Sequence, residues 1–268
     1  MKILILGDIM GLSGREVIKN KLPNIIKKNN LGFVIVNGEN AADDGRGITK
    51  NIAEEFFSSG VDVITSGNHI WDKEETTNYI DKENRLLRPA NFAEGSLGRG
   101  NEIYFSKNKK YKIGVINLMG NVFMRKTEDV FQEAKKLSKK IILKKDVDFL
   151  VVDFHGEITS EKMAAGHFFD GHATCVVGTH THIPTADTRI LDNGTAYQTD
   201  IGMCGDYNSV IGMNKENSIK KFFKDKEAVK HYPAEGEATL SGIIVETDTE
   251  TGLAKSVTRL IDGGNLVN

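Results

Sequence analysis

The stretch VVGTHTHIPT at residues 176–185 joins an apolar run to two histidines, His180 and His182, that stand one residue apart. An apolar run that ends in glycine is typical of a buried strand, and the polar residues after it then lie at the strand's carboxyl end. Two imidazoles in one loop can be directed at one point, as a metal site requires. The pair alone does not establish a metal, so further ligands must come from the rest of the chain.

The apolar run before these histidines is one of six short segments that we predict to be buried strands. Each is rich in Val and Ile and ends near Gly, Asn or Asp. Amphipathic segments lie between them, and this alternation favours an α/β fold with strands flanked by helices. The predicted strands are residues 2–6, 33–37, 61–65, 112–117, 148–152 and 174–178.

Three amphipathic segments carry helix signals. Residues 49–60 begin with a candidate N-cap, Thr49, and end in a glycine, which is common just after a helix. Apolar residues recur every three or four positions in residues 130–141, with lysines between them. Residues 15–28 also have a helical pattern, but Pro23 removes a backbone donor and should split or kink that helix.

The pattern becomes richer in strands after about residue 185. Residues 188–191, 195–199 and 238–247 read as strands, which predicts a second sheet packed on the first. The chain contains no internal repeat, no low-complexity tract and no evident linker. We therefore expect one domain that spans residues 1–268.

Composition and charge argue against several classes of protein. The 268 residues include 35 basic and 37 acidic side chains, for a formal net charge of −2. That balance does not favour binding to duplex nucleic acid or to a membrane surface. The N-terminal apolar run is too short for a signal peptide, and no stretch is long enough to span a bilayer. Cys175 and Cys204 lie far apart without a C-x-x-C motif, so a reducing cytoplasm is the expected location.

Metal-capable side chains follow five of the predicted strands, in each case at the carboxyl end. In open α/β sheets this edge is where ligands bind. Glycines precede four of the five groups and allow the backbone to turn sharply there. The candidate residues are Asp8, Glu39, Asn40, Asn68, His69, His155, His180 and His182.

This set is too large for one ion and suits two divalent ions bridged by a carboxylate. Mixed nitrogen and oxygen ligands without thiolate favour iron, manganese or zinc. Two such ions, the carboxylates of Asp8 and Glu39, and a bridging hydroxide would leave a net charge of roughly +1. Such a centre attracts an anion and stabilises negative charge that grows on oxygen, as displacement at phosphorus requires.

The order of these residues resembles that of the calcineurin-like metallophosphoesterases. Gly-Asn-His at residues 67–69 and Gly-x-His-x-His at residues 178–182 carry the likeness. That superfamily usually opens with Asp-x-His, but this chain has Met10 at the histidine position, and Glu39 replaces the usual second aspartate. With the segments GDIMG, NGENAA, LLRPAN and HGE, the pattern is similar to the YmdB-like branch. The resemblance implies a four-layer α/β/β/α fold, in which helices flank a two-sheet β-sandwich, and hydrolysis of 2′,3′-cyclic nucleotides.

The resemblance also implies a role for each candidate ligand. Glu39 would bridge two divalent ions, and Asn40 would supply the ligand that is missing at Met10. A hydroxide between the ions would attack phosphorus. Iron or manganese is favoured, with zinc or magnesium as alternatives. One ion would be held by Asp8, Glu39, Asn40 and His182, and the other by Glu39, Asn68, His155 and His180.

His69 stands beside a ligand without being needed as one. It would protonate the departing ribose oxygen, a task suited to a group that titrates near neutrality. The alternative is a structural histidine that donates to a backbone carbonyl. The three other histidines, His167, His172 and His231, have no ligand pattern, and we expect surface or packing roles for them.

We predict roles at the rim of the site or in packing for several further residues. Asp72 reads as a helix N-cap and Trp71 as a packing residue. Arg46 would lie near the mouth of the site, in a flexible rim loop. Arg88 would contact a phosphate or form an ion pair. Cys204, in a glycine-rich segment, is expected to be exposed and not catalytic.

Two classes of function remain open from the sequence. The first is a metal-dependent phosphodiesterase that acts on small phosphoesters, with 2′,3′-cyclic nucleotides favoured and a homo-oligomeric state expected. The second is a regulatory protein that keeps the metal centre and acts through a partner. Rival enzymes are a phosphomonoesterase, a protein phosphatase and a nuclease, although a near-neutral charge argues against long nucleic acids.

Overall fold

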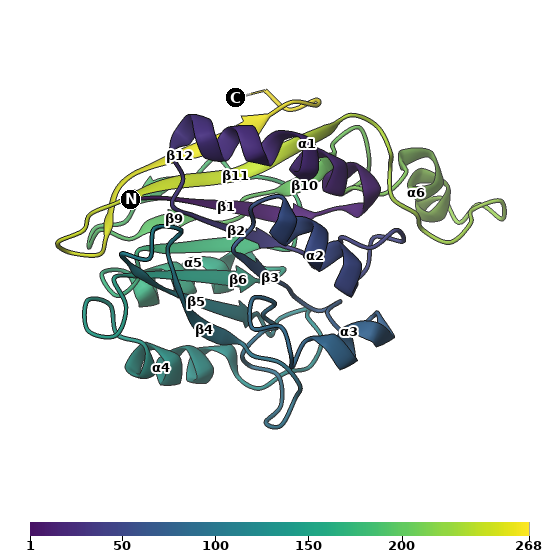
Figure 1. The fold of residues 1–268 in the computed structure, drawn as a ribbon. Coiled ribbons are helices and arrows are strands. Elements are labelled where there is room, and N and C mark those ends of the chain that lie inside the picture. Colours follow the sequence, from purple (N-terminus) through teal and green to yellow (C-terminus); the bar gives the residue numbers. More distant parts are fainter. Residues whose placement is uncertain (268) are drawn as a thin grey trace.

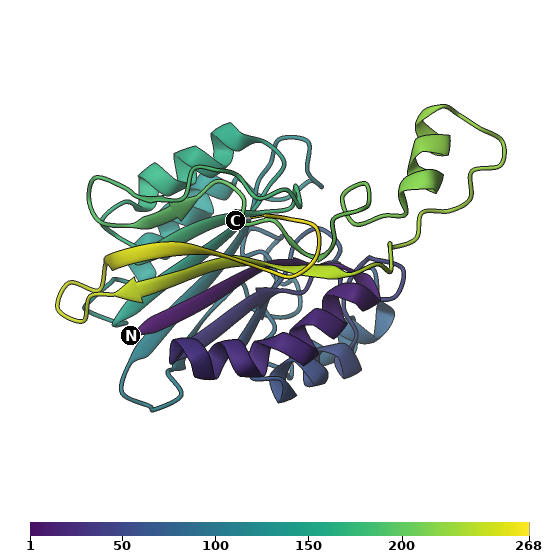
Figure 2. The same ribbon diagram turned by 90° about the horizontal axis from the view of Figure 1, so that it is seen from above.

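Alternate residues of strand β1 (Lys2–Ile9) pack into two different hydrophobic cores. Leu4 and Leu6 face a layer of helices, whereas Ile3 and Ile5 face a second sheet. Successive side chains of a strand point to opposite faces, so a strand that is apolar on both belongs to a sheet covered on both sides. The structure, a computed structural model that describes residues 1–267, shows two such sheets stacked face to face (Figures 1 and 2).

Each sheet has six strands and combines parallel with antiparallel pairs. The first has the order β12-β11-β10-β1-β2-β3, and the second β4-β5-β6-β7-β9-β8. Strands β1, β2 and β3 are parallel, as are β5, β6, β7 and β9, so the carboxyl ends within each group meet at one edge. Besides β1, the first sheet contains β2 (Phe33–Asn37), β3 (Val63–Thr65), β10 (Met203–Asp206), β11 (Ala238–Thr247) and β12 (Ala254–Asp262). The second contains β4 (Asn101–Phe105), β5 (Lys112–Met119), β6 (Phe149–His155), β7 (Cys175–Thr179), β8 (Arg189–Ile190) and β9 (Ala196–Gln198).

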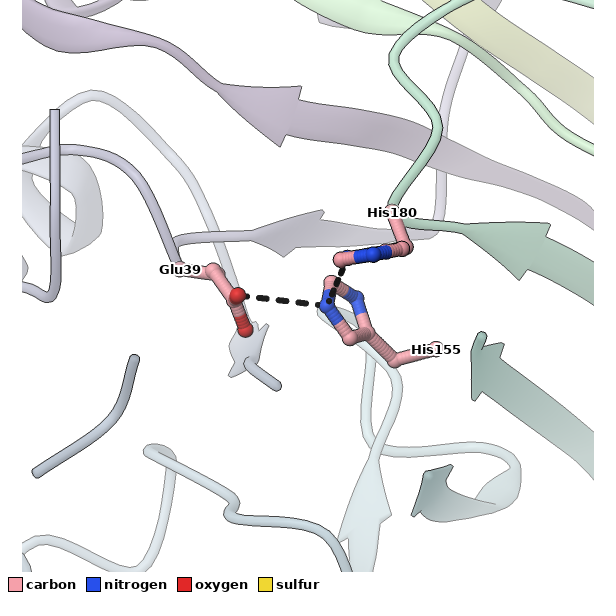
Figure 3. Close-up of side chains that lie close together, drawn as sticks. All are labelled: Glu39, His155 and His180. Atoms are coloured by element: carbon pink, nitrogen blue, oxygen red, sulfur yellow. Dashed lines mark hydrogen bonds and ion pairs between the residues drawn. The ribbon is translucent and has the colours of Figure 1, made fainter. Parts of the chain in front are cut away.

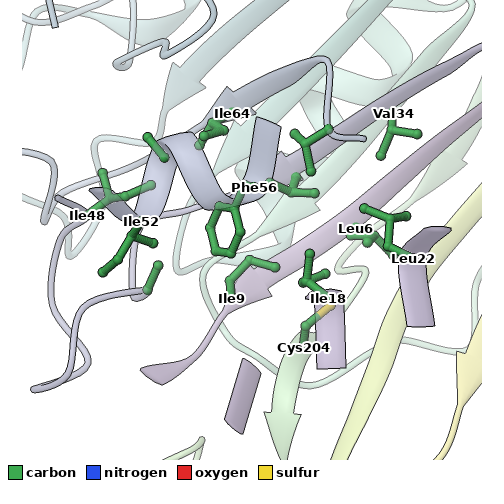
Figure 4. Packing of buried hydrophobic residues seen from close by; sticks show 14 of the residues in the cluster. Leu6, Ile9, Ile18, Leu22, Val34, Ile48, Ile52, Phe56, Ile64 and Cys204 are labelled. Carbon is green, nitrogen blue, oxygen red and sulfur yellow. The ribbon is translucent and has the colours of Figure 1, made fainter. Parts of the chain in front are cut away.

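Helices cover the outer face of each sheet and complete four layers. Helices α1 (Gly11–Asn29) and α2 (Lys50–Ser58) pack on the first sheet, where Leu22 and Phe56 belong to the same hydrophobic core as Leu6 of β1 (Figure 4). Helices α4 (Val130–Lys140) and α5 (Thr159–Phe169) pack on the second sheet. Two shorter helices are α3 (Glu74–Tyr79), which follows β3, and α6 (Lys215–Phe222), which projects beyond the sheets.

All six strands predicted from apolar runs are present, and the α/β/β/α layering is confirmed. The expectation of a second sheet built from the segment after residue 185 is wrong. Strands β8 and β9 extend the sheet that begins at β4, whereas β10, β11 and β12 extend the sheet that contains β1. Local patterns mark these strands correctly but do not say which edge they join, because that choice depends on long-range pairing.

Helix α1 also differs from expectation. It begins at Gly11 and passes through Pro23 as one continuous helix. Leu22 and Ile25 on either side of the proline are buried against the first sheet, and this packing offsets the lost backbone hydrogen bond. Among residues 1–267, no helix combines the length and apolar character that crossing a bilayer would need.

Candidate metal centre

The loops after five parallel strands meet at one edge of the sandwich, and the predicted ligands lie there together. They border or underlie a cavity of about 410 Å³. Glu39, Asn40, His180 and His182 line the cavity, and so does His69. The other three predicted ligands, Asp8, Asn68 and His155, lie in contact with that group and are buried.

Three side chains from three different strand ends converge most closely. Glu39, His155 and His180 each offer one ligand atom, and these atoms all lie within 4.8 Å of one another (Figure 3). The Nε2 atom of His155 is 3.2 Å from Oε1 of Glu39 and 3.1 Å from Nδ1 of His180. Oδ1 of Asn68 lies 3.3 Å from the same Nε2 atom. Three ligand atoms thus lie within 3.3 Å of Nε2 of His155.

A second group lies beside the first. Nε2 of His182 is 3.2 Å from Oδ1 of Asn40, and its Nδ1 donates a hydrogen bond of 2.8 Å to the carbonyl of Ile211. Asp8 lies against the first group, because its Oδ2 accepts the backbone N–H of His180 while its Oδ1 lies 3.7 Å from Nδ1 of His155.

Three of the four carboxylate oxygens of Asp8 and Glu39 lack a hydrogen-bond partner among the described residues. Oδ1 of Asp8 and both side-chain oxygens of Glu39 are buried and have no hydrogen-bond partner of good geometry among the described residues. An unpaired buried acceptor costs about 1–3 kcal/mol, and more when it is charged. Three such oxygen atoms close together fit a metal centre, in which a bound cation would be their partner.

The proton on His155 is placed by the residues beneath it. Thr179 donates its hydroxyl to Asp153 at 2.8 Å, so it accepts from Nδ1 of His155 at 3.0 Å. Nε2 is then left without a proton and turns its lone pair toward the oxygen of Glu39. Two facing lone pairs repel one another unless a cation lies between them, and a carboxylate or hydroxyl behind a histidine ligand is a common means of fixing its tautomer.

Burial sets the protonation of the whole group. It raises the pKa of Asp8 well above its usual range and that of Glu39 to about 7, although the nearby His69 opposes the rise at Glu39. Burial likewise lowers the pKa of His155 well below its ordinary value and that of His180 to about 2. The imidazoles are therefore neutral, which is the form that binds metal, and the carboxylates need a nearby cation to ionise at low cost.

The backbone is adapted to bring these atoms close together. A Cβ atom at Gly67 would lie 1.9 Å from Oε2 of Glu39 and 2.2 Å from Nε2 of His155, so this position requires glycine. His180 and His182 have positive φ angles of 98° and 67°. Residues with side chains rarely adopt this region, and such strain concentrates at functional sites.

The loop that carries both histidines is held by a buried ion pair. Nζ of Lys162 lies 2.7 Å from Oδ2 of Asp200, and the same oxygen accepts the backbone N–H and the hydroxyl of Thr181, which stands between the two histidines. Glu157 meets Nε2 of His180 at 3.1 Å from the cavity side. No role is predicted for these four residues from the sequence. Only Glu157 belongs to a motif, the HGE segment, that could have pointed to the site.

His69 lies on the cavity wall, outside the closest cluster of ligand atoms. Its Nδ1 is 2.7 Å from Oδ2 of Asp72, which also receives Arg125 through its other oxygen. The expected N-cap role of Asp72 is wrong, because α3 begins at Glu74 and the residue before it is Lys73. The carboxylate serves His69 instead.

Some of the remaining expectations are confirmed and others are wrong. Arg46 lines the cavity as expected, and Trp71 packs edge-on against Phe92. Arg88 makes neither of its expected contacts, because its guanidinium donates to the backbone carbonyls of residues 89, 90, 96 and 97. Cys204 is fully buried in β10, not exposed. His167 and His172 lie on the surface, but His231 lines the cavity.

The layered fold and its ligand-rich edge define a metallophosphoesterase of the calcineurin-like fold. The chain belongs to the YmdB-like protein family, whose family model matches residues 4–260. It is 44% identical over 261 residues to a 2′,3′-cyclic-nucleotide 2′-phosphodiesterase of Bacillus subtilis (strain 168), with 97% of each chain covered.

Two solved structures show how far the likeness extends. A novel phosphatase from Mycoplasma pneumoniae superposes with a TM-score of 0.89 at 37% identity and covers 98% of this chain and 93% of its own. A 5′-nucleotidase from Candida albicans superposes with a TM-score of 0.53 at 12% identity, over 97% of this chain and 50% of its own, and shares the fold alone. The family and the relatives identify this chain as a metal-dependent phosphoric ester hydrolase.

Proposed function

We propose that the protein is a dinuclear-metal phosphodiesterase that hydrolyses 2′,3′-cyclic nucleotides. The observation that carries this proposal is the set of unpartnered oxygens of Asp8 and Glu39 among neutral imidazoles at the floor of a cavity. The activity of the Bacillus subtilis relative, which is similar over nearly the whole chain, supports the choice of substrate. Small cyclic phosphodiesters also suit a chain with a net charge of −2, which does not favour long nucleic acids.

The ligand assignment follows the two spatial groups, except that Asp8, which contacts the first group, is given to the second ion by the resemblance to related enzymes. Asn68, His155 and His180 would hold one ion, and Asp8, Asn40 and His182 the other, with Glu39 bridging the two. Each Glu39 oxygen is unpartnered, which fits a carboxylate that serves two ions. Nitrogen and oxygen ligands without thiolate suit iron or manganese best, with zinc or magnesium as alternatives.

The chain's own residues would bind the phosphodiester and handle the leaving oxygen. Two divalent ions would supply Lewis-acid stabilisation of the phosphoryl oxygens and an activated water. His69 would act as the general acid, with its ring held by Asp72 and its free nitrogen available to the ribose oxygen. Arg46, at the cavity wall, would add positive charge near the entering anion.

A substrate panel tests the proposal. Protein loaded with Mn²⁺ or Fe²⁺ should hydrolyse 2′,3′-cyclic AMP with a higher kcat/KM than a linear diester such as bis(4-nitrophenyl) phosphate or a monoester such as 4-nitrophenyl phosphate. A preference for the monoester would favour a phosphatase. Absence of turnover on every ester, with metal bound, would favour a regulatory protein that acts through a partner.

Three general features complete the proposal. We infer a single domain over residues 1–268, because all three hydrophobic cores draw on both sheets or on the helices that cover them. A homo-oligomer is supported by exposed apolar side chains such as Phe105 and Phe123. Both cysteines are free, which suits a reducing compartment such as the cytoplasm.

A further inference from the structure

Residues 207–233, here termed the α6 arm, stand apart from the sandwich. The arm leaves β10, forms α6 and returns to β11, and both views show it projecting beyond the sheets (Figures 1 and 2). Its inner side forms part of the wall of the metal-site cavity. The proposed reaction at phosphorus gives this wall no task, because the ligands and His69 all come from other segments.

The base of the arm is tied to the metal site. The carbonyl of Ile211 accepts the Nδ1 proton of His182, and Ala234 donates to the carbonyl of Gly212 at 2.8 Å. Met10 packs beneath this turn, since a Cβ atom at Gly212 would lie 2.4 Å from its Cγ. The arm therefore has a defined position relative to the ligands, with Met10 packed under it.

The inner face of the arm is apolar and ends in an aromatic ring. Val210, Ile211, Met213 and Phe222 all line the cavity. The side chain of Phe222 is 78% exposed, so its ring is uncovered at the cavity mouth. An exposed aromatic face beside an anion-binding centre is a suitable platform for a planar ring that carries a phosphate.

Two polar atoms in the same wall lack partners. Oγ of Ser218 and Nδ1 of His231 are buried and have no hydrogen-bond partner among the described residues, and both side chains line the cavity. Ser218 is only 1% exposed, so water does not readily satisfy its hydroxyl. A hydroxyl and an imidazole nitrogen beside an aromatic ring offer a donor and an acceptor for the edge of a heterocycle.

We propose that the inner face of the α6 arm is the subsite for the nucleobase of the substrate. Phe222 stacks on the base, and Ser218 with His231 hydrogen-bonds to its edge, while the phosphate lies on the metal ligands below. The inference rests on the proposed function, since it assigns the base of the same cyclic nucleotide. A cavity of about 410 Å³ is within the range of small-molecule sites.

A matched pair of neighbouring phenylalanines provides the test. Phe222→Ala removes the ring that lines the cavity, and Phe223→Ala removes a ring that is similarly exposed, at 82%, but does not line it. Two substrates are compared with the metal-loaded protein: 2′,3′-cyclic AMP, and methyl riboside 2,3-cyclic phosphate, which keeps the reacting ring and lacks the base.

Phe222→Ala should raise KM for 2′,3′-cyclic AMP about tenfold with kcat unchanged, because base stacking contributes binding and not chemistry. It should leave KM for the base-free ester unchanged. Phe222→Trp should restore the low KM, and Phe223→Ala should change neither substrate.

Several results would overturn the subsite. Equal effects of Phe222→Ala on both substrates, or no effect on either, would do so. If Phe222→Ala had a lower molar mass by light scattering and lost the same activity on both substrates, Phe222 would belong to a subunit interface instead. Wild-type protein that hydrolyses both cyclic esters with the same KM would refute the subsite alone, whereas failure to hydrolyse either would refute the proposed function.

Discussion

Nδ1 of His69 lies 2.7 Å from Oδ2 of Asp72, three residues further along the chain. The carboxylate fixes the orientation of the ring, and hydrogen bonding at Nδ1 leaves Nε2 as the nitrogen available to a bound molecule. A histidine held in this way by a carboxylate, on the wall of a cavity that also contains metal ligands, is arranged as a proton donor would be. A general acid and a purely structural histidine at this position make different predictions.

If His69 is the general acid, His69→Ala should lower kcat on 2′,3′-cyclic AMP by about 10²–10⁴-fold, which is the usual contribution of a positioned proton donor. The ribose alkoxide is a poor leaving group and needs the proton. A nitrophenyl ester releases a stable anion, so its hydrolysis should change little. Both rates are measured on protein of known metal content.

Asp72→Asn is the companion variant for this experiment. It keeps the shape of the partner but weakens its hold on Nδ1, so it should produce a smaller loss with the same dependence on the leaving group. Equal losses on both esters, with metal content intact, would remove the acid role and leave His69 as an orienting or phosphate-binding group.

The number of ions per chain tests the ligand assignment. Wild-type protein purified from metal-replete cells should contain about two ions per chain by elemental analysis. Glu39→Ala should lose more metal than Asp8→Ala, because both oxygens of Glu39 lack other partners, whereas Oδ2 of Asp8 already accepts the backbone N–H of His180. A constant value of one ion or less in a fully active protein would contradict the dinuclear centre.

Much of the site could be predicted from the sequence, because parallel strands bring their carboxyl ends to one edge. That rule places Asp8, Glu39 and His155 together although they are far apart in the chain. It could not reveal Lys162 or Asp200, since a lone lysine in a helix and a lone aspartate after a strand carry no local sign of their pairing. The same limit explains Asp72, whose neighbours suggested a cap while the fold turned it toward His69.

The α6 arm shows a second limit. No role at the site is predicted for these residues from the sequence, and His231 is expected to have a surface or packing role. Their place above the metal site follows from the path of the chain between β10 and β11. This path brings residues that are more than 200 positions from Asp8 to the same cavity. Only three-dimensional contact reveals such a wall.

Metal removal should reveal the cost of ionising Glu39. Burial raises its pKa from 4.5 to about 7, so between these values the carboxyl is protonated in the folded protein and ionised in the unfolded one. Unfolding then releases a proton, and the free energy of unfolding falls as pH rises, by about 1.4 kcal/mol per pH unit for this group. The stabilising contribution is complete below pH 4.5 and is lost as pH rises through about 7.

Comparison with Glu39→Gln isolates this effect, because the buried histidines, whose pKa values are lowered, give the opposite slope below pH 6.5. Urea melts of metal-free wild type and metal-free Glu39→Gln should show the variant gaining relative stability between pH 4.5 and 7. A difference that does not vary with pH would mean that Glu39 ionises normally without metal.

The single-domain proposal predicts a simple proteolysis pattern. Because strands from both ends of the chain share the first sheet, cleavage between residues 69 and 178 should not release two stable halves. Limited trypsin digestion should instead cut first in the projecting α6 arm, where Lys224, Lys226 and Lys230 are exposed. Two long-lived fragments divided between the Gly-Asn-His and His-x-His segments would contradict a shared core and a shared site.

The buried pair of Lys162 and Asp200 should matter more than any surface ion pair. Both side chains are 1% exposed and their charged atoms are 2.7 Å apart. Lys162→Met leaves the carboxylate buried without its counter-charge, so we expect a loss of about 3–5 kcal/mol in the free energy of unfolding. Asp200 also holds Thr181, so a shift of that carboxylate should lower metal content as well.

Lys136→Met is the matched control. Lys136 pairs with Glu133 at 3.3 Å, but its side chain is 73% exposed, so its loss should cost less than about 1 kcal/mol and leave the metals in place. Urea denaturation and elemental analysis of both variants give the comparison. If Lys162→Met were no more costly than Lys136→Met and kept its metals, the pair would not hold the histidine loop, and the strained backbone at His180 and His182 would need another support.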